Sequence, residues 1–185
     1  DPLAWLGAQQ CYPQFYWQQR NGDEELAALG AVITFSSLAL ATQFLREQNA
    51  AGDTRICGLN AFNPEQGSLF LPRLFWRRTA GTATLRLQLW SDYSLQEDAH
   101  AARDFLQRLQ PARPIRPLAV QVEHENHQPQ RAEWLRLVRR ATETIARGDF
   151  EKVVLARATD LQFTQRINPV ALMAASRDLN LHCYH

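Results

Sequence analysis

Hydrophobic and polar positions alternate along much of the first half of the chain, which predicts a region rich in β-strands. The alternation is clearest over residues 82–90, where one face carries Ala83, Leu85, Leu87 and Leu89. A period of two with one apolar face is typical of a half-buried antiparallel strand. Aromatic and β-branched residues between turn-forming ones predict further strands over residues 14–19, 30–36, 54–62 and 68–76.

Helical spacing of apolar residues predicts two helices in this first part of the chain. Ser36 or Ser37 is placed to cap a short helix that follows it. Ser94 with Glu97 three residues later forms a capping box for a second helix. The prolines from Pro111 onward end this helix.

Two more helices are predicted in the second half. The first carries an apolar stripe that should pack in the core, formed by Trp134, Leu137, Val138, Ala141 and Ile145. Gly148 stands where a C-terminal glycine cap belongs. The second helix begins at Asn168 and Pro169, an N-cap followed by proline at the first helical position. Residues 179–185 then read as the beginning of a strand.

These elements predict an α+β fold with large, mainly antiparallel sheets and helices packed outside them. The expected domains are a β-rich lobe over residues 1–110, a proline-rich linker or crossover over 111–130, and the start of a second lobe over 131–185. The linker contains His124 and His127, which we interpret as solvated loop residues because they lack the spacing of helical metal ligands.

Composition narrows the function classes. The formal net charge of +1, with acidic and basic residues interleaved, argues against a nucleic-acid-binding protein. The sequence has no apolar stretch long enough to span a membrane, so no membrane partner is expected. Three cysteines, odd in number and far apart, favour reduced thiols and a cytoplasmic location over a disulfide framework.

One lysine stands at the start of an apolar run after the third predicted helix. Residues 149–157 read Asp-Phe-Glu-Lys-Val-Val-Leu-Ala-Arg, which is typical of a buried strand. Alternation places Lys152 on one face and Arg157 on the other. A lysine in such a strand loses hydration, which disfavours its charged form and makes it a candidate general base. The alternative is a strand-end lysine that extends to water.

Residues 145–157 resemble the signature of the chorismate-utilising enzymes, and specifically of the isochorismate synthases. In that family a helix ends in glycine and leads to a strand with the motif Lys-Val-Val-Leu-(Ala or Ser)-Arg, which residues 152–157 match. Residues 12–20 with 29–31, and 56–62 with 71–73, are similar to the menaquinone-pathway isochorismate synthases of enteric bacteria. The resemblance covers nearly the whole chain and corresponds to the N-terminal part of the chorismate-binding fold.

The resemblance implies an Mg²⁺-dependent enzyme that adds water at C2 of chorismate while the C4 hydroxyl leaves. It assigns the general base that activates water to Lys152. It also implies that the Mg²⁺ ligands and the general acid lie in the family's C-terminal part, outside this chain, so no residue here is predicted to bind metal. Ammonia-using relatives often carry glutamine at the position of Lys152 in the motif. The lysine of this chain therefore favours water as the nucleophile.

Several alternatives stay open at this point. Salicylate synthases share the motif lysine and go on to eliminate pyruvate, and siderophore-pathway isochorismate synthases catalyse the same first step. A polypeptide of this extent could also be a non-catalytic lobe. The oligomeric state stays open, with a homodimer as one option.

Overall fold

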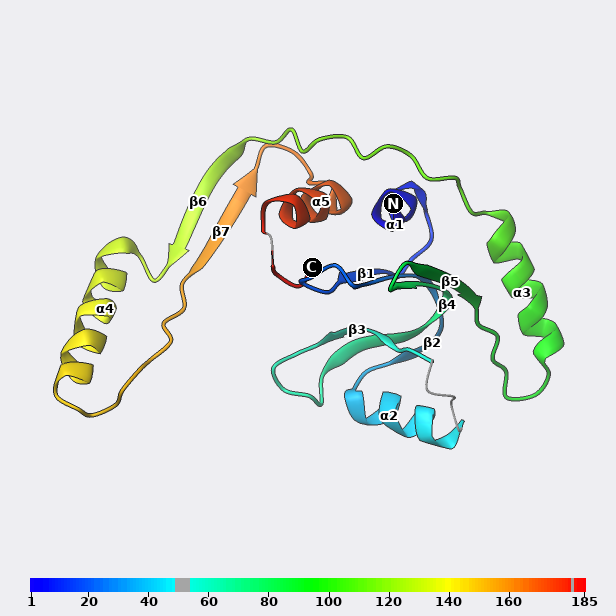
Figure 1. Ribbon diagram of the computed structural model, residues 1–185, viewed down its shortest axis with the longest axis horizontal. Coiled ribbons are helices and arrows are strands. Elements are labelled where there is room, and N and C mark those ends of the chain that lie inside the picture. The colour runs from blue at the N-terminus through cyan, green and yellow to red at the C-terminus, as the bar shows by residue number, and fades with distance from the viewer. Residues whose placement is uncertain (49–53, 181) are drawn as a thin grey trace. The chain divides into compact units, whose positions relative to one another are not determined.

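The computed structural model describes residues 1–48, 54–180 and 182–185. The chain forms two compact units (Figure 1). Unit 1 comprises residues 1–117 and 169–185, and unit 2 comprises residues 118–168. Unit 1 is therefore discontinuous in sequence, because the chain leaves it for unit 2 and then returns. Among the described helices, none combines the length and the apolarity that crossing a membrane requires.

A five-stranded antiparallel sheet is the centre of unit 1. Its strands are β1 (Gln14–Gln18), β2 (Glu24–Phe35), β3 (Cys57–Asn60), β4 (Gly67–Thr79) and β5 (Thr82–Leu87). They lie in the order β1-β2-β4-β3, and β5 also pairs with β4. All the pairings are antiparallel, with Gln14 opposite Leu29 and Ala28 opposite Phe75. β1 is thus an edge strand, whereas the long strand β4 lies in the interior of the sheet.

The described residues of unit 1 form four helices: α1 (Pro2–Ala8), α2 (Leu38–Glu47), α3 (Leu95–Gln107) and α5 (Pro169–Leu179). Ser37 caps α2 by accepting a hydrogen bond from the Leu40 amide, and Ser94 caps α3 by accepting one from the Gln96 amide. Ser37 and Ser94 are confirmed as helix caps, and the predicted start at Pro169 is confirmed, because these signals depend only on neighbouring residues. The reciprocal bond of the predicted capping box does not form, because the Ser94 amide donates to the Ser91 hydroxyl oxygen at 3.2 Å instead of to Glu97.

In the described part of unit 1, the buried apolar residues form three clusters. The first contains Leu6 of α1, Phe105 of α3 and three sheet residues, Ala27, Leu29 and Leu74. The second lies around Ala28, Cys57, Phe70 and Phe75, and the third joins α2 to the sheet through Ala41, Phe35 and Leu71. The neighbours Ala27 and Ala28 belong to different clusters because successive strand residues face opposite sides of a sheet.

A buried ion pair ties α3 to the sheet. Arg73 of β4 donates from both terminal nitrogens to the two carboxylate oxygens of Asp98, each at 2.6 Å. The side chains are only 10% and 14% exposed. Asp98 also accepts a hydrogen bond from the Trp90 amide. Strand β4, the loop between β5 and α3, and helix α3 therefore meet at one carboxylate.

Unit 2 is a two-stranded antiparallel ladder with one helix. Strand β6 (Val122–Gln128) pairs with β7 (Ala158–Phe163), and α4 (Arg131–Ala146) lies between them in sequence. The predicted polar loop around His124 and His127 is therefore wrong in its secondary structure, because these residues lie in β6. Residues 111–121 carry no regular element.

The predicted α+β class with antiparallel sheets is confirmed.

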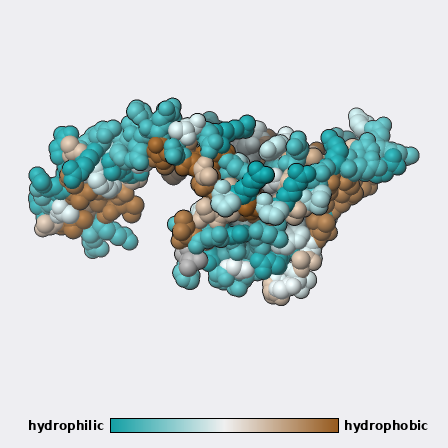
Figure 2. All heavy atoms as spheres, turned by 90° about the horizontal axis from the view of Figure 1, so that it is seen from above, coloured by the Kyte–Doolittle hydropathy of each residue, from teal (hydrophilic) through white to brown (hydrophobic). Residues whose placement is uncertain are grey.

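Two predictions of burial are wrong. The row Leu85, Leu87 and Leu89 is exposed, with Leu85 at 62%, because β5 borders the sheet and no described element covers that row. The apolar stripe of α4 lies at the surface as well, and Figure 2 shows apolar residues there. The division into domains at 1–110, 111–130 and 131–185 stays a prediction.

Candidate functional site

The segment that connects α4 to β7 carries the candidate chemistry, and its start is fixed by a helix cap. Gly148 has a φ of +83° and donates its amide to the Ile145 carbonyl at 2.9 Å. The Asp149 amide donates to the Thr144 carbonyl at 3.3 Å. These two bonds form a Schellman motif, in which glycine adopts the left-handed conformation without steric cost. The predicted glycine cap is confirmed.

Lys152 lies just beyond this cap, in extended backbone without strand pairing. Its side chain is exposed, and Val154 in the same run is 92% exposed. The prediction of a buried strand over residues 149–157 is therefore wrong for the described part of the chain. The burial that would disfavour a charged lysine is not provided by these residues.

The end of the β6–β7 ladder explains the missing strand. β7 begins at Ala158, opposite Gln128, the last residue of β6. Pro129 follows and has no amide hydrogen to donate, and α4 begins at Arg131. The chain before Ala158 therefore has no continuing neighbour in β6. Arg157, predicted on the face opposite Lys152, donates its Nε to the Pro129 carbonyl at 3.1 Å.

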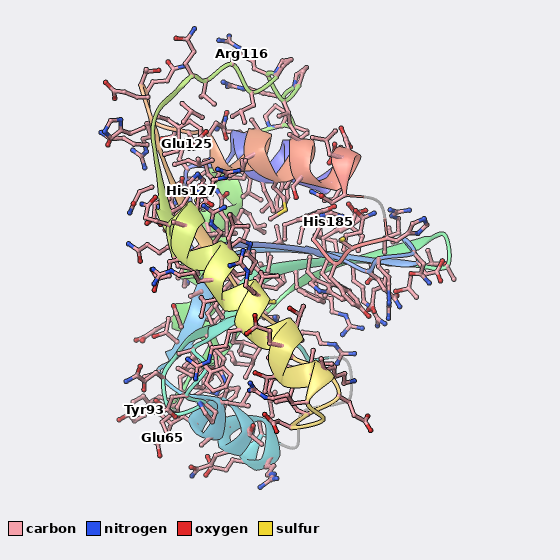
Figure 3. All side chains as sticks on the ribbon, turned by 90° about the vertical axis from the view of Figure 1, so that its left-hand side faces the viewer. Glu65, Tyr93, Arg116, Glu125, His127 and His185 are labelled. Carbon is pink, nitrogen blue, oxygen red and sulfur yellow. The ribbon has the colours of Figure 1, made fainter. Side chains whose placement is uncertain are left out.

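The two histidines of β6 have partners within unit 2. His127 contacts the Thr159 hydroxyl through Nδ1 at 2.9 Å, and its Nε2 lies 3.7 Å from Glu125. Glu125 and His127 lie near each other on the strand (Figure 3). Within residues 1–48, 54–180 and 182–185, no group of three or more His, Cys, Asp or Glu side chains could hold a metal ion.

Sequence reasoning missed a buried polar cluster in unit 1. Glu25 of β2 accepts hydrogen bonds at 2.7 Å from the Tyr16 hydroxyl and from Arg78, and Arg177 of α5 lies 4.0 Å from it. Arg177 also donates to the Tyr16 hydroxyl at 3.4 Å and pairs with Asp1 at 3.5 Å. The cluster fastens α5 and the N-terminal end of α1 to the sheet.

The burial of this cluster changes the acidity of Tyr16. Desolvation by burial raises the pKa of Tyr16 to about 12, with Arg177 opposing the rise and Glu25 adding to it. The phenol therefore stays protonated and keeps donating to Glu25. One signal in the sequence could have revealed the cluster: Glu25 directly precedes the apolar run of β2, so a charge at that position needs a partner.

The fold of unit 1, with the glycine-capped helix and the lysine motif of unit 2, defines the class of protein. A family model described as chorismate binding enzyme matches residues 59–185, and the chain belongs to that family.

Individual relatives narrow the comparison. The chain is 55% identical over 185 residues to isochorismate synthase MenF of Escherichia coli (strain K12), which covers 100% of this chain and 43% of that protein. It is 30% identical over 184 residues to isochorismate synthase MenF of Pasteurella multocida (strain Pm70), covering 99% of this chain and 41% of that protein.

A solved structure agrees with these relatives. The structure of MenF, the menaquinone-specific isochorismate synthase from Escherichia coli, superposes with a TM-score of 0.88 at 55% identity, over 100% of this chain and 43% of that one. The chain thus spans less than half the length of the relatives it matches.

Proposed function

We propose that this chain is the N-terminal part of an isochorismate synthase that converts chorismate to isochorismate for menaquinone biosynthesis. The observation that supports this most is the 55% identity to the Escherichia coli enzyme, which extends over all 185 residues. The match therefore includes unit 1, which lies outside the lysine motif.

Lys152 is proposed as the general base. It takes a proton from water as the water oxygen bonds to C2 of chorismate, both double bonds of the ring diene shift by one position, and the C4 hydroxyl leaves as water with a proton from an acid. The Schellman cap at Gly148 holds the start of the segment and so sets where Lys152 projects from unit 2. The role requires that the remainder of the enzyme enclose Lys152, because a base must be set against its substrate with competing water excluded.

Magnesium is proposed as a requirement of the complete enzyme. The residues described here do not fit an Mg²⁺ site, which needs several carboxylate or other oxygen ligands around one point. A cytoplasmic location is also proposed, consistent with three cysteines that are all free thiols.

The test uses a full-length protein that contains this chain. It is incubated with chorismate, with and without Mg²⁺ and without ammonia, and the products are separated by chromatography. Isochorismate that forms only with Mg²⁺ supports the proposal. Salicylate with pyruvate would identify a salicylate synthase instead, and unchanged chorismate would indicate a non-catalytic role.

Lys152→Ala tests the proposed base. We expect kcat to fall about 10²- to 10⁴-fold, the usual contribution of a general base, while the protein stays folded. Glu151→Ala is the matched control, because Glu151 is an exposed neighbour with no assigned role. Turnover by Lys152→Ala within a few-fold of the parent enzyme would contradict the assignment.

A further inference from the structure

The segment that carries Lys152 returns along the whole length of α4. Helix α4 has 16 residues and takes the chain about 24 Å away from its start at Arg131. Residues 148–157 bring the chain back to the start of β7 (Figure 1). A stretch of this length reaches at most about 33–36 Å. The segment therefore has to stay extended over most of its length, although no described strand pairs with it.

The two faces of this extended segment differ in exposure. Val154 is 92% exposed, whereas its neighbour Val153 is 44% exposed and Leu155 is half-buried. Successive side chains of an extended chain point to opposite sides. Val153 and Leu155 therefore face the rest of unit 2 together with Arg157. Lys152 shares the outward face with Val154.

Arg157 makes a contact that holds this orientation. Its Nε donates to the Pro129 carbonyl at 3.1 Å, directly before Gln130, the N-cap residue of α4. A bond from a guanidinium is charge-assisted and directional, so it fixes the side chain as well as the backbone beside it. The other end of the segment is held by the Schellman motif at Gly148. The segment is thus fastened near both ends of α4.

The β6–β7 ladder by itself leaves this orientation open. It ends with the pair of Gln128 and Ala158, and no described residue pairs with the chain before Ala158. A shift of one residue in an extended chain turns every side chain to the opposite side. Such a shift would turn Lys152 from the outward face toward α4. The bond from Arg157 opposes the shift, because it forms only while Arg157 itself faces unit 2.

We propose that Arg157 is a positioning residue for Lys152. It holds the orientation of the segment and does not touch the reacting atoms. The role rests on the proposed function, in which Lys152 takes a proton from water. A misplacement of about 1 Å costs a catalytic group on the order of 100-fold in rate. The bond itself adds little to the stability of the fold, because it lies at the surface.

Kinetics of the full-length protein test the role. Arg157→Met removes the donor and keeps a long side chain. We expect kcat for isochorismate formation to fall about tenfold or more, with KM within about twofold of the parent value. The melting temperature should shift by less than about 3 °C.

Two further variants make the comparison specific. Arg157→Lys keeps a charged donor and should recover most of the lost kcat. Arg139→Met is the matched control, because Arg139 is an exposed arginine of α4, and its kcat should stay within about twofold of the parent. A kcat for Arg157→Met as high as that of the control would overturn the proposal, and so would a loss that lies in KM.

A double variant separates positioning from a general effect on the structure. Lys152→Ala removes the base, so adding Arg157→Met should lower the residual rate by less than about twofold. A further loss as large as the one that Arg157→Met causes in the parent would show that Arg157 acts on something other than Lys152, and would overturn the proposal.

Methyl NMR of the same full-length proteins measures the fastening without reference to activity. The order parameters of the Val153 and Leu155 methyl groups should fall in Arg157→Met and stay unchanged in Arg139→Met. Unchanged order parameters in Arg157→Met would overturn the proposal whatever the kinetics. A parent protein that forms no isochorismate, but in which Arg157→Met lowers the order parameters, would overturn the proposed function and the catalytic role of Arg157 with it, and leave the fastening itself supported.

Discussion

The carboxylate of Asp98 shows how a single residue can fix the position of a helix. Two charge-assisted bonds from Arg73 and one from the Trp90 amide satisfy it in a largely buried setting. Hydrogen bonding to Arg73 holds the pKa of Asp98 below its usual value, although burial acts in the opposite direction. The charged form is therefore the one that the fold selects.

A pH prediction follows for Asp98. Because its folded pKa lies below the unfolded value of about 3.9, its contribution to stability is present above that value. The contribution is lost as the pH falls through the lower, folded pKa. We expect Asp98→Asn to lower the free energy of unfolding by about 3 kcal/mol near neutral pH, since it leaves Arg73 buried without a charged partner.

Urea unfolding of the parent and the variant between pH 7 and pH 2.5 measures this effect. The difference between the two should shrink toward the acid end. Asp104→Asn is the control, because Asp104 lies exposed on the same helix and should change stability by less than about 0.5 kcal/mol. A difference between Asp98→Asn and the parent that stays constant over the whole range would show that the ion pair is not its cause.

At the scale of elements, two glycines with positive φ make a matched comparison. Gly30 has a φ of +68°, and a Cβ built there would lie 2.7 Å from Cε2 of Phe105. Gly148 has a φ of +83°, and a Cβ there would meet nothing within 4 Å. Gly30 therefore serves both the backbone conformation of β2 and the approach of α3, whereas Gly148 serves only the end of α4.

We predict that Gly148→Ala costs about 1 kcal/mol, the penalty for a left-handed alanine. Gly30→Ala should cost more, by about 1 to 3 kcal/mol of overpacking against Phe105. Urea denaturation of each variant gives both values. Adding Phe105→Leu to Gly30→Ala should recover part of the loss, and equal costs for the two single variants would contradict this account.

The same scale shows which elements could be predicted from sequence. Ser37, Ser94 and Gly148 were identified correctly because a helix end is specified by residues within one turn of it. The strand expected over residues 149–157 failed for the opposite reason. A strand exists only beside a partner strand. Within the described chain, residues 152–157 have no such partner, because β6 ends before Pro129 and α4 begins soon after it.

The candidate site divides in the same way. Lys152 was found through a contiguous motif, and its position after a capped helix was predicted correctly. Its burial could not be predicted, because burial depends on elements distant in sequence. The Glu25 cluster was missed since its members come from β1, β2, β4 and α5, which only the fold brings together.

At the scale of the whole molecule, exposed apolar rows predict how the isolated 185-residue polypeptide behaves. Leu85 and Leu87 form such a row on β5, and Leu89 continues it just beyond the end of the strand. Adjacent exposed apolar side chains on an edge strand favour association between copies. We expect the isolated polypeptide to self-associate and to bind a hydrophobic dye.

Sedimentation at several concentrations, with and without Leu85→Lys and Leu87→Lys, measures this behaviour. The double variant should sediment as a smaller species, since the lysines break the apolar row. A substitution of the same kind at two exposed polar positions of β5, Thr82→Lys and Thr84→Lys, is the control. An isolated polypeptide that stays monomeric would contradict the prediction.

The return of the chain from unit 2 to unit 1 has a consequence for biosynthesis. α1 packs against α5, and a Cβ at Gly7 would lie only 3.0 Å from Val170. At synthesis rates of about 5–20 residues per second, α5 leaves the ribosome on the order of 10–30 s after α1. During that interval Leu6 can pack against the sheet and Phe105, whereas the surface of α1 at Gly7 waits for Val170, so α1 reaches its final packing only after α5 has been made.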